Sequence, residues 1–467
     1  MNDLLDADVD HKGDPPRALG SRTAERTILL VCPTMWDEGE LPHIVDAGRY
    51  RVLIYGSDDS EHPEDFDAID FIDRAAVVGA DQDVDGVMAS DDYPGSIVAA
   101  AIAQQLNLPG PHPEAVLLCH HKYYSRVAQQ QAVPEAVPAF DLVDPTPVST
   151  ATNGLSFPIF VKPVKSFFSL FAQEVADGDE LRALAQRAHY HLQEFVKPFN
   201  QLLARYTAFP LNGSYILAET PLHGQQVTVE GCVFRGEGRI IGITDSIMYP
   251  GTISFQRFEY PSVLSSAIQD LMSELALRFM HSIGFDDGLF NIEMFYDSDS
   301  EAISIIEVNP RMCPQFADLM EKVNGVNTYE IALSIAAGIR PQLHSEARTH
   351  RVAMSFALRL FEDSLVTRVP NAVEIAAFVS LFPDARLKVL CREGHRLSEE
   401  LQDGKSYRYA VLNLGAESRA DALVRCERAL RILPFSFEVI APATPRNQED
   451  NRSVSGKVLP CLKDPAH

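Results

Sequence analysis

The chain has 467 residues, of which 46% are hydrophobic and 22% are charged, and its formal net charge is −25. The length and composition are those of a globular protein of about three domains. The acidic excess argues against a nucleic-acid backbone or an anionic membrane surface as the main partner, but it does not exclude an anionic small molecule in a local basic pocket.

The seven cysteines are odd in number and widely spaced, and no CxxC pair occurs. This pattern indicates reduced thiols rather than a disulfide framework or a zinc site. The N-terminus is acidic without the apolar core of a signal peptide, and no apolar run approaches the roughly 20 residues that cross a bilayer. We therefore expect a soluble, cytoplasmic protein.

The two ends of the chain, residues 1–24 and 442–467, are polar and aperiodic, so both are predicted to be mobile tails. Residues 25–118 alternate apolar strands, such as ERTILLVCP and YRVLIYGSDD, with a helix in GSIVAAAIAQQL. This alternation predicts a parallel sheet in a small α/β domain. The domain lacks a GxGxxG run, so a dinucleotide-binding domain is not predicted.

Further along the chain, FPIFVKPVKSFFSLFAQEV predicts two strands flanking a loop, and residues 179–206 have a helical period. Residues 214–247 predict a series of strands with glycine turns. The stretch from Pro261 to residue 285 predicts an amphipathic helix with Pro261 in its first turn. Its expected apolar stripe is Leu264, Ile268, Leu271, Leu275 and Phe279. In the last segment YRYAVLNLGA predicts a strand, and Ser418 opens a helix.

Two glutamates interrupt the apolar runs LFNIEMFY and ISIIEVNP, which predict the strands of a hairpin. Side chains alternate between the two faces of a strand. If Glu293 lies opposite Glu307, then Asn309 lies on the same face, within cross-strand distance. Regular alternation also puts Ile303 and Ile305 on the face of Glu307, which suggests that this face is enclosed.

Carboxylates that converge in this way repel one another unless a cation joins them. Mg²⁺ and Mn²⁺ prefer oxygen ligands of this kind, and nucleotide phosphates complete their coordination. Arg311, two residues past Asn309, can hold a transferred phosphoryl group. The alternative is an ordinary antiparallel pair with one solvated face, on which Glu and Asn need no cation.

Three further residues have a functional and a structural interpretation each. Lys162 ends an apolar strand, where it either extends to solvent or points at a ligand anion. Glu219 precedes a linker that can offer backbone groups to an adenine edge, or it is a strand-terminal acid in solvent. Lys122, in CHHKYYSR, carries the weakest signal of the three.

The elements VKP, a strand ending in AE, a helix, GLFNIEMF, an acidic turn and IIEVNPRM occur in the order found in the ATP-grasp superfamily. The chain resembles this superfamily over about 25–440, and most resembles its carboxylate–amine ligase branch, similar to bacterial L-amino-acid ligases. The resemblance implies a mixed α/β fold in which two lobes clasp ATP. The implied parts are an N-terminal α/β domain at 25–118, a small lobe with a helical insert at 119–225, a large lobe with the metal site at 226–345 and a C-terminal α/β lobe at 346–441.

The resemblance also implies roles for single residues. Lys122 and Lys162 would contact ATP phosphates, and Glu219 and Leu222 would hold the adenine edge. Arg311 would stabilise the γ-phosphate and an acyl-phosphate intermediate. Two Mg²⁺ ions would be held by Glu293, Glu307 and Asn309.

Three departures from the superfamily pattern stand out. Gln226 occupies the position of the expected ribose-binding acid, although its amide can still bind hydroxyl groups. The phosphate-covering loop VKSFFSLFA contains no glycine and carries the bulky Phe167 and Phe168, with Ser169 as a remaining donor. The stretch MCPQFADLM replaces the glycine-rich acceptor-binding residues of relatives.

The implied reaction activates a carboxylate as an acyl phosphate and couples it to an amine, with an amino acid as the expected amine, releasing ADP and phosphate. One alternative is another acyl- or carboxy-phosphate reaction with a non-amine acceptor, although no biotin-carrier-type segment is visible. Another is a nucleotide-binding protein with a degenerate lid. A serine or cysteine hydrolase is disfavoured because no GxSxG occurs. The resemblance suggests a homodimer with small-molecule substrates, whose identities the sequence does not predict.

Overall fold

The computed structural model describes residues 16–21, 25–45, 48–56, 66–145, 154–166, 170–399 and 406–440. The chain forms two compact units. The first comprises Met1–Gly242, Leu264–Ala317 and Asn327–Leu343. The second comprises Ile243–Val263, Asp318–Val326 and His344–His467. The four-part division of the chain between residues 25 and 441 stays a prediction.

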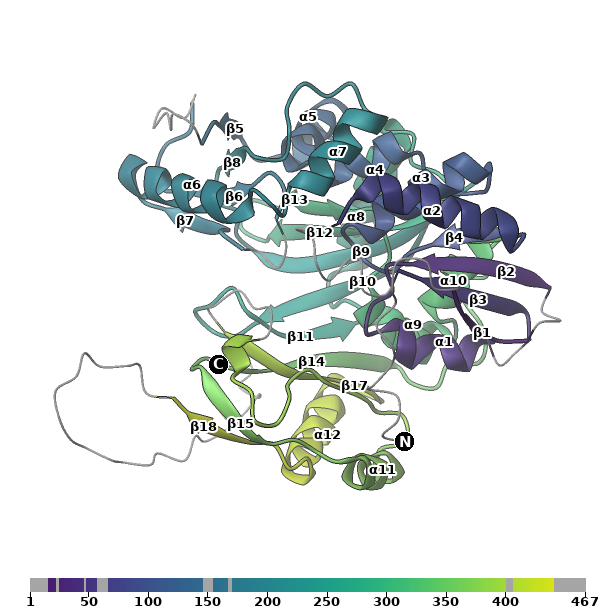
Figure 1. Ribbon diagram of the computed structural model, residues 1–467. Helices are drawn as coiled ribbons and strands as arrows, with labels where there is room; N and C mark the ends of the chain where they lie inside the picture. The colour runs from purple at the N-terminus through teal and green to yellow at the C-terminus, as the bar shows by residue number, and fades with distance from the viewer. Residues whose placement is uncertain are drawn as a thin grey trace, which may run out of the picture. The chain divides into compact units, whose positions relative to one another are not determined.

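The first sheet of the first unit has four strands in the order β1-β3-β2-β4, with β2 parallel to both β3 and β4 (Figure 1). The parallel pairing agrees with the prediction for residues 25–118. Strand β1 lies within the segment predicted as a tail and pairs antiparallel with β3. The bounds are β1 Arg17–Leu19, β2 Arg26–Val31, β3 Tyr50–Tyr55 and β4 Gly86–Met88, with helices α1 Asp37–Val45, α2 Ala68–Asp81 and α3 Gly95–Leu106.

A second sheet in this unit is antiparallel, in the order β5-β8-β6-β7. The helical period over 179–206 belongs to two helices, because Pro198 in the first turn of the second one lacks the N–H group that a continuous helix needs. The bounds are β5 Phe140–Val143, β6 Ile159–Pro163, β7 Gln173–Val175, β8 Ile216–Glu219, α4 Pro113–His120, α5 Lys122–Ala132, η1 Pro134–Ala136, α6 Gly178–Leu192 and α7 Lys197–Tyr206.

The third sheet of the first unit carries the predicted hairpin, in the order β13-β12-β9-β10, and β10 continues into the second unit at Ile243. Helix α8 begins at Ser266 rather than near Pro261, because the Ser265 hydroxyl caps it by accepting from the N–H of Ile268. The predicted stripe is wrong at Leu271, which is 53% exposed; the buried face is Met272, Leu275, Ala276, Phe279 and Met280.

The remaining elements of this unit are β9 Gln225–Phe234, β10 Glu237–Met248, α8 Ser266–Ser282, β12 Gly288–Asp297, β13 Ala302–Asn309, η2 Pro314–Phe316 and α10 Thr328–Ala336.

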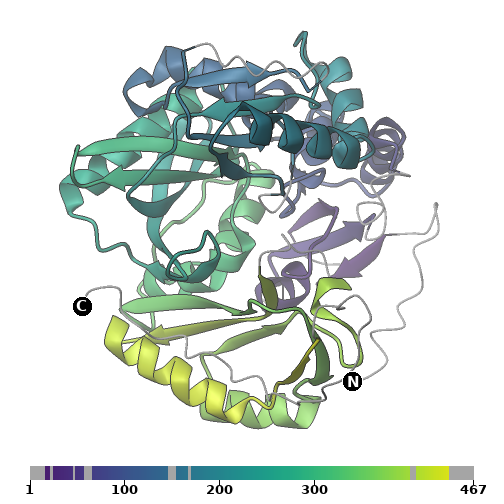
Figure 2. The same cartoon turned by 90° about the vertical axis from the view of Figure 1, so that its left-hand side faces the viewer.

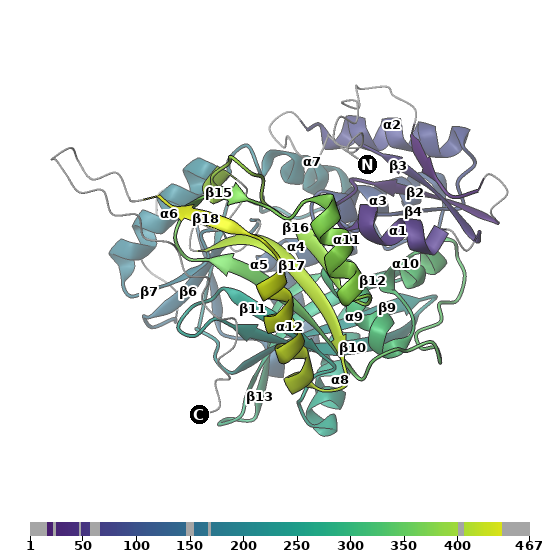
Figure 3. The same cartoon turned by 90° about the horizontal axis from the view of Figure 1, so that it is seen from below.

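The second unit is built on strands in the order β10-β11-β14-β17-β16, all antiparallel where the pairing is described. Helices α11 and α12 lie against this sheet (Figures 2 and 3), and Ser418 caps α12 as predicted. The bounds are β11 Phe255–Tyr260, α9 Ala317–Asn324, β14 Val352–Leu360, β15 Ser364–Arg368, α11 Ala372–Leu381, β16 Arg386–Val389, η3 Leu397–Glu399, β17 Tyr407–Ala416, α12 Arg419–Ile432 and β18 Ser436–Val439.

None of the helices in the described ranges is both long enough and apolar enough to cross a membrane. Six of the seven cysteines fall in these ranges and all six are free thiols.

Candidate active site

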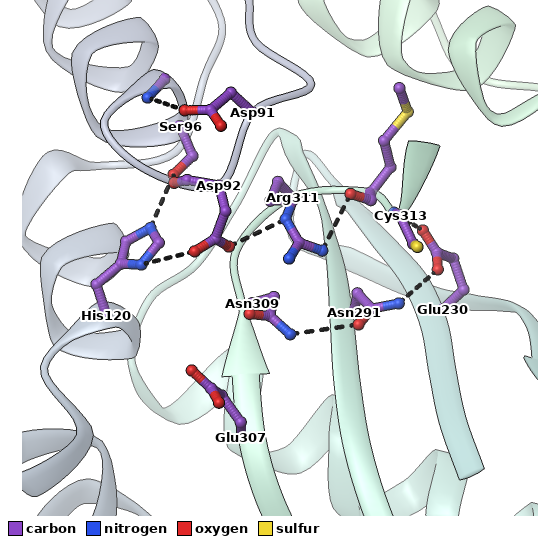
Figure 4. Close-up of polar contacts among 12 residues, drawn as sticks. Asp91, Asp92, Ser96, His120, Glu230, Asn291, Glu307, Asn309, Arg311 and Cys313 are labelled. Carbon is purple, nitrogen blue, oxygen red and sulfur yellow. Dashed lines mark hydrogen bonds and ion pairs between the residues drawn. The ribbon is translucent and has the colours of Figure 1, made fainter. Parts of the chain in front are cut away.

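The predicted hairpin register is confirmed between β12 and β13. Asn291 pairs with Asn309 and Glu293 pairs with Glu307. Figure 4 shows Glu307 and Asn309 following one another on one side of β13, with Asn291 facing Asn309 across the strands. The two carboxylates and the amides therefore share one face of the sheet.

A β-bulge corrects one expectation about this face. The register shifts between Glu293 and Met294, so that Ile306 is the extra residue and Met294 pairs with Ile305. Paired residues share a face, so Ile303 and Ile305 lie on the opposite face from Glu307, where both are buried. The predicted crowding of isoleucines beside Glu307 is therefore wrong. The bulge also turns the backbone carbonyl of Ile306 toward two cations, the Arg126 Nη2 at 2.8 Å and the Lys162 Nζ at 3.2 Å.

The two glutamates of the register pair have different electrostatic environments. Burial, together with the negative charge of Glu307, raises the pKa of Glu293 to about 7, and its Oε2 accepts from Gln226 Nε2 at 2.9 Å. Burial alone would raise the pKa of Glu307 as well, but the Lys122 Nζ lies 2.8 Å from its Oε1. The ammonium groups of Lys122 and Lys162 hold the pKa of Glu307 below its usual value.

A chain of hydrogen bonds fixes the amide of Asn309. Glu230 on β9 is fully buried and accepts from Asn291 Nδ2 at 2.8 Å and from the N–H of Cys313 at 2.7 Å. Asn291 Oδ1 then accepts from Asn309 Nδ2 at 3.4 Å (Figure 4). Because the nitrogen of Asn309 is used in this way, its Oδ1 is the atom left to face a cation. Burial raises the pKa of Glu230 to about 7.

Lys162 belongs to a buried ion-pair network with Glu219. Its Nζ lies 2.7 Å from Glu219 Oε2, while Arg126 Nε donates to Glu219 Oε1. Burial lowers the pKa of Lys162, and the charge of Glu219 opposes that change. The same carboxylate is stabilised by both cations, which hold the pKa of Glu219 below its usual value although burial alone would raise it.

Arg311 belongs to a second cluster, formed with Asp92, His120 and Lys165. Arg311 Nε lies 3.0 Å from Asp92 Oδ1, and Lys165 Nζ lies 3.8 Å from Asp92 Oδ2. Burial alone would raise the pKa of Asp92, but the neighbouring Arg311 and Lys165 charges hold this pKa well below its usual range. Burial, together with the Lys165 charge, lowers the pKa of His120 well below its usual value, so its ring is neutral near pH 7.

The hydrogen bonds of the cluster fix the tautomer of that ring. Lys165 Nζ lies 3.0 Å from His120 Nδ1, and because an ammonium group can only donate, Nδ1 is the acceptor. The ring proton is therefore on Nε2, which is 2.8 Å from Ser96 Oγ, and the Ser96 hydroxyl donates to the backbone carbonyl of Asp92 (Figure 4). The loop after β4, helices α3 and α4 and the segment that follows β6 thus supply one connected polar network.

Comparison with known proteins agrees with this architecture. Residues 155–320 match the family model described as ATP-grasp domain. A solved L-amino acid ligase from Bacillus licheniformis has a TM-score of 0.66 at 16% sequence identity, covering 88% of this chain and 98% of that one. The chain has the ATP-grasp fold. The superfamily resemblance and the mixed α/β class predicted from the sequence are thereby confirmed.

Other solved structures match over similar lengths. A biotin carboxylase from Campylobacter jejuni has a TM-score of 0.58 at 16% identity, covering 88% of this chain and 92% of that one. An N5-carboxyaminoimidazole ribonucleotide synthetase, solved with ADP, has a TM-score of 0.61 at 13% identity, with coverages of 88% and 97%. At the sequence level, the uncharacterized protein y4rH of Sinorhizobium fredii is 23% identical over 374 residues, 77% of this chain and 70% of that protein.

Most of the site residues expected for an ATP-grasp enzyme lie close together. Contacts or charge interactions connect Lys122, Lys162, Glu219, Gln226, Glu293, Glu307 and Arg311 in one region. Gln226 donates to Glu293, so it lies beside the predicted metal ligands. Leu222 is half-buried in the linker between β8 and β9. Ser169, Phe167 and Phe168 lie outside the described residues, and the roles of all these residues stay predictions.

Several residues of the site were missed by sequence reasoning: Asp92, His120, Arg126, Lys165 and Glu230. Two of them carried a usable signal. Arg126 is one helical turn after Lys122 on α5, so both point from the same face. Asp92 follows the carboxyl end of the parallel strand β4, where ligands of α/β sheets gather. No sequence pattern marked Glu230, because the role of a single acid in a buried strand depends on the residues that it contacts in the folded protein.

The predicted magnesium ligands pass a chemical test of fit. Over the residues that the structure describes, no three His, Cys, Asp or Glu side chains form a metal site. The candidate set instead has two carboxylates and the amide oxygen of Asn309, all hard oxygen donors of the kind that Mg²⁺ and Mn²⁺ accept. Burial and the charge of Glu307 raise the pKa of Glu293, and a divalent cation bound between the two carboxylates would offset their repulsion. The residues present therefore fit the ion.

Proposed function

We propose that this protein is an ATP-dependent carboxylate–amine ligase. The carboxylate oxygen of one substrate attacks the γ-phosphorus of ATP, giving an acyl phosphate and ADP. The amine of a second substrate, which we propose to be an amino acid, attacks the acyl carbon and expels phosphate, and its proton is released. The observation that carries this proposal is the register pair of Glu293 and Glu307, which shares one face with Asn309 and lies amid the charges of Lys122, Lys162 and Arg311.

The side chains of this region supply positioning and charge, which are the main requirements of phosphoryl transfer. Lys122 and Lys162 would bind phosphate oxygens, and the guanidinium of Arg311 would stabilise the charge of the transferred group. Glu293, Glu307 and Asn309 would hold Mg²⁺, which when bound neutralises phosphate charge. Glu230 and Asn291 orient the oxygen of Asn309 for that purpose.

The proposal is tested by a phosphate-release screen with ATP, Mg²⁺ and pairs of amino acids. We expect release that requires both amino acids of a productive pair and that EDTA abolishes. Glu307→Ala should reduce the rate at least about a hundredfold, because it removes a charged contact to the reacting groups. Glu301→Ala, an exposed acid in the turn of the same hairpin, is the matched control and should keep the full rate.

Two results would contradict the proposal. If the Glu307→Ala variant released phosphate at the same rate as the unaltered protein, the predicted metal ligands would have no role in the reaction. Release that needs bicarbonate in place of the carboxylate amino acid would favour a carboxylation, as the names of the biotin carboxylase and the carboxyaminoimidazole synthetase suggest for those proteins. A homodimeric state and a cytoplasmic location are further parts of this proposal that rest on the sequence.

A further inference from the structure

Arg126 on α5 is a buried arginine, with 2% of its surface exposed. Each of its three side-chain nitrogens donates to a protein oxygen. Nε donates to Glu219 Oε1, Nη1 to Gln129 Oε1, and Nη2 to the backbone carbonyl of Ile306 at 2.8 Å. A guanidinium is planar and carries its donors in a rigid fork, so these contacts fix the position of the group and of the oxygens that it holds.

Two of these oxygens belong to different parts of the candidate site. Glu219 ends β8 at the predicted adenine edge, and Ile306 is the bulge residue directly before the predicted metal ligand Glu307. Lys162 Nζ contacts the same two residues, 2.7 Å from Glu219 Oε2 and 3.2 Å from the Ile306 carbonyl. Since Lys162 is expected to bind phosphate, Arg126 is the contact that keeps the two residues joined when the lysine turns to a ligand.

Helix α5 holds β13 at two consecutive residues. Lys122 lies one helical turn before Arg126, and its Nζ is 2.8 Å from Glu307 Oε1. The carbonyl of the preceding residue, Ile306, accepts from Arg126. Both the side chain and the backbone at Glu307 are therefore held from α5, and the backbone contact comes from the same guanidinium that orients Glu219.

We propose that Arg126 is a positioning residue that couples the adenine edge of the nucleotide site to its metal ligands, so that binding at either end strengthens binding at the other. This inference rests on the proposed function and deepens it, because it assigns the link between two parts of one site. A ligand at either end restricts the motion of the oxygens that Arg126 shares, so a second ligand has less motion to restrict. The coupling is reciprocal, because one free energy links the two binding events.

The coupling is measured on the full chain with adenosine and Mn²⁺. Adenosine has no phosphate, so it cannot contact the metal through one as ATP would. Electron paramagnetic resonance follows Mn²⁺ binding without any turnover. We expect saturating adenosine to lower the Kd of Mn²⁺ at least about fivefold, the lower end of the usual range for coupled sites. Adenosine alone should also slow the hydrogen exchange of the β13 amides.

Arg126→Lys keeps a positive charge beside Glu219 but cannot reach Glu219 and Ile306 together, because an ammonium group lacks the fork of a guanidinium. The ratio of the Mn²⁺ Kd values without and with adenosine should fall nearly to one. A purely structural role for Arg126 would lower the free energy of unfolding of the variant and leave this ratio unchanged. The matched control is Arg182→Lys, at an exposed arginine of α6 that pairs with Asp179, and it should keep the full ratio.

The outcomes separate this inference from the proposed function. If adenosine changes neither the Kd of Mn²⁺ nor the β13 exchange in the unaltered protein, the inference is overturned, whether or not Arg126→Lys folds. A ratio that Arg126→Lys retains overturns it as well, because the coupling then runs through other residues. Coupling that depends on Arg126, but no phosphate release with any pair of amino acids, overturns the ligase function and leaves the coupled nucleotide site. Phosphate release without coupling between adenosine and Mn²⁺ overturns the inference alone.

Discussion

At the residue scale, the candidate site is a set of buried charges that depend on one another. Lys162, Lys165, Glu219 and Glu230 are each at most 6% exposed. Burying an unpaired charge costs several kcal/mol, so each of these groups needs its partner for the fold as well as for any ligand. Mutations here therefore change stability and activity together, and matched controls must separate the two effects.

Removing Glu219 should destabilise the first unit strongly. Glu219→Leu leaves both Lys162 and Arg126 without their carboxylate, and breaking a buried pair of this kind costs about 3–5 kcal/mol. Urea denaturation measures the loss. The control is Glu237→Leu, which removes an exposed acid that pairs with Arg239 and Arg340 and should not change the midpoint measurably. Equal midpoints for the two variants would contradict the prediction.

Glu230 should make the stability depend on pH. The folded pKa of about 7 exceeds the usual value of 4.5, so between these values the folded state binds more protons than the unfolded state. The free energy of unfolding must therefore fall as the pH rises from about 4.5 to 7, by on the order of 3 kcal/mol at most. Glu230→Gln cannot ionise and should remove this part of the slope. Unfolding curves at pH 5 and pH 8 measure it, and parallel slopes in both proteins would show that Glu230 does not contribute.

At the element scale, the β12–β13 hairpin shows both the reach and the limit of sequence reasoning. The alternation of apolar and polar residues was sufficient to pair Glu293 with Glu307. The bulge at Ile306 could not be predicted, because an inserted residue leaves a sequence that still alternates on either side. Its effect is specific, since Ile303 and Ile305 join the buried face and the Ile306 carbonyl turns toward Arg126 and Lys162.

Deleting Ile306 should therefore disable the hairpin in one of two ways. Without the bulge, the pairing of β12 with β13 becomes regular along its whole length. Either Ile303 and Ile305 then leave the core, or Glu307 and Asn309 leave the face that carries Glu293. Exposing two isoleucines costs roughly 3–6 kcal/mol, while the second route spares the core and abolishes Mg²⁺-dependent nucleotide binding. Urea unfolding and calorimetric titration with MgATP distinguish these results. Inserting one glycine after Asp299, in the turn, keeps the register and should leave both properties intact.

At the scale of the whole molecule, the sequence predicted the ATP-grasp order of elements but not the meeting of distant segments. Asp92, His120 and Lys165 come from three stretches separated by more than a hundred residues from Arg311 in the sequence, and only the fold makes them neighbours. Local patterns carry strand alternation and helix caps, which is why Ser418 and the Glu293 register were predicted. They carry no information on which loop of one sheet meets which strand of another.

The single tryptophan, Trp36, lies in the first unit and therefore reports on the unit that holds the candidate site. A ligand that binds only the folded state at about a hundred times its Kd adds about 2.7 kcal/mol to the free energy of unfolding. MgATP should thus raise the temperature of the tryptophan transition by a few degrees, and Lys162→Met should lose most of that shift. Lys197→Met, an exposed lysine on α7, is the matched control and should keep it. An equal shift in both variants would mean that the nucleotide binds without Lys162. No shift in the unaltered protein would contradict the proposed ATP site on this face of the sheet.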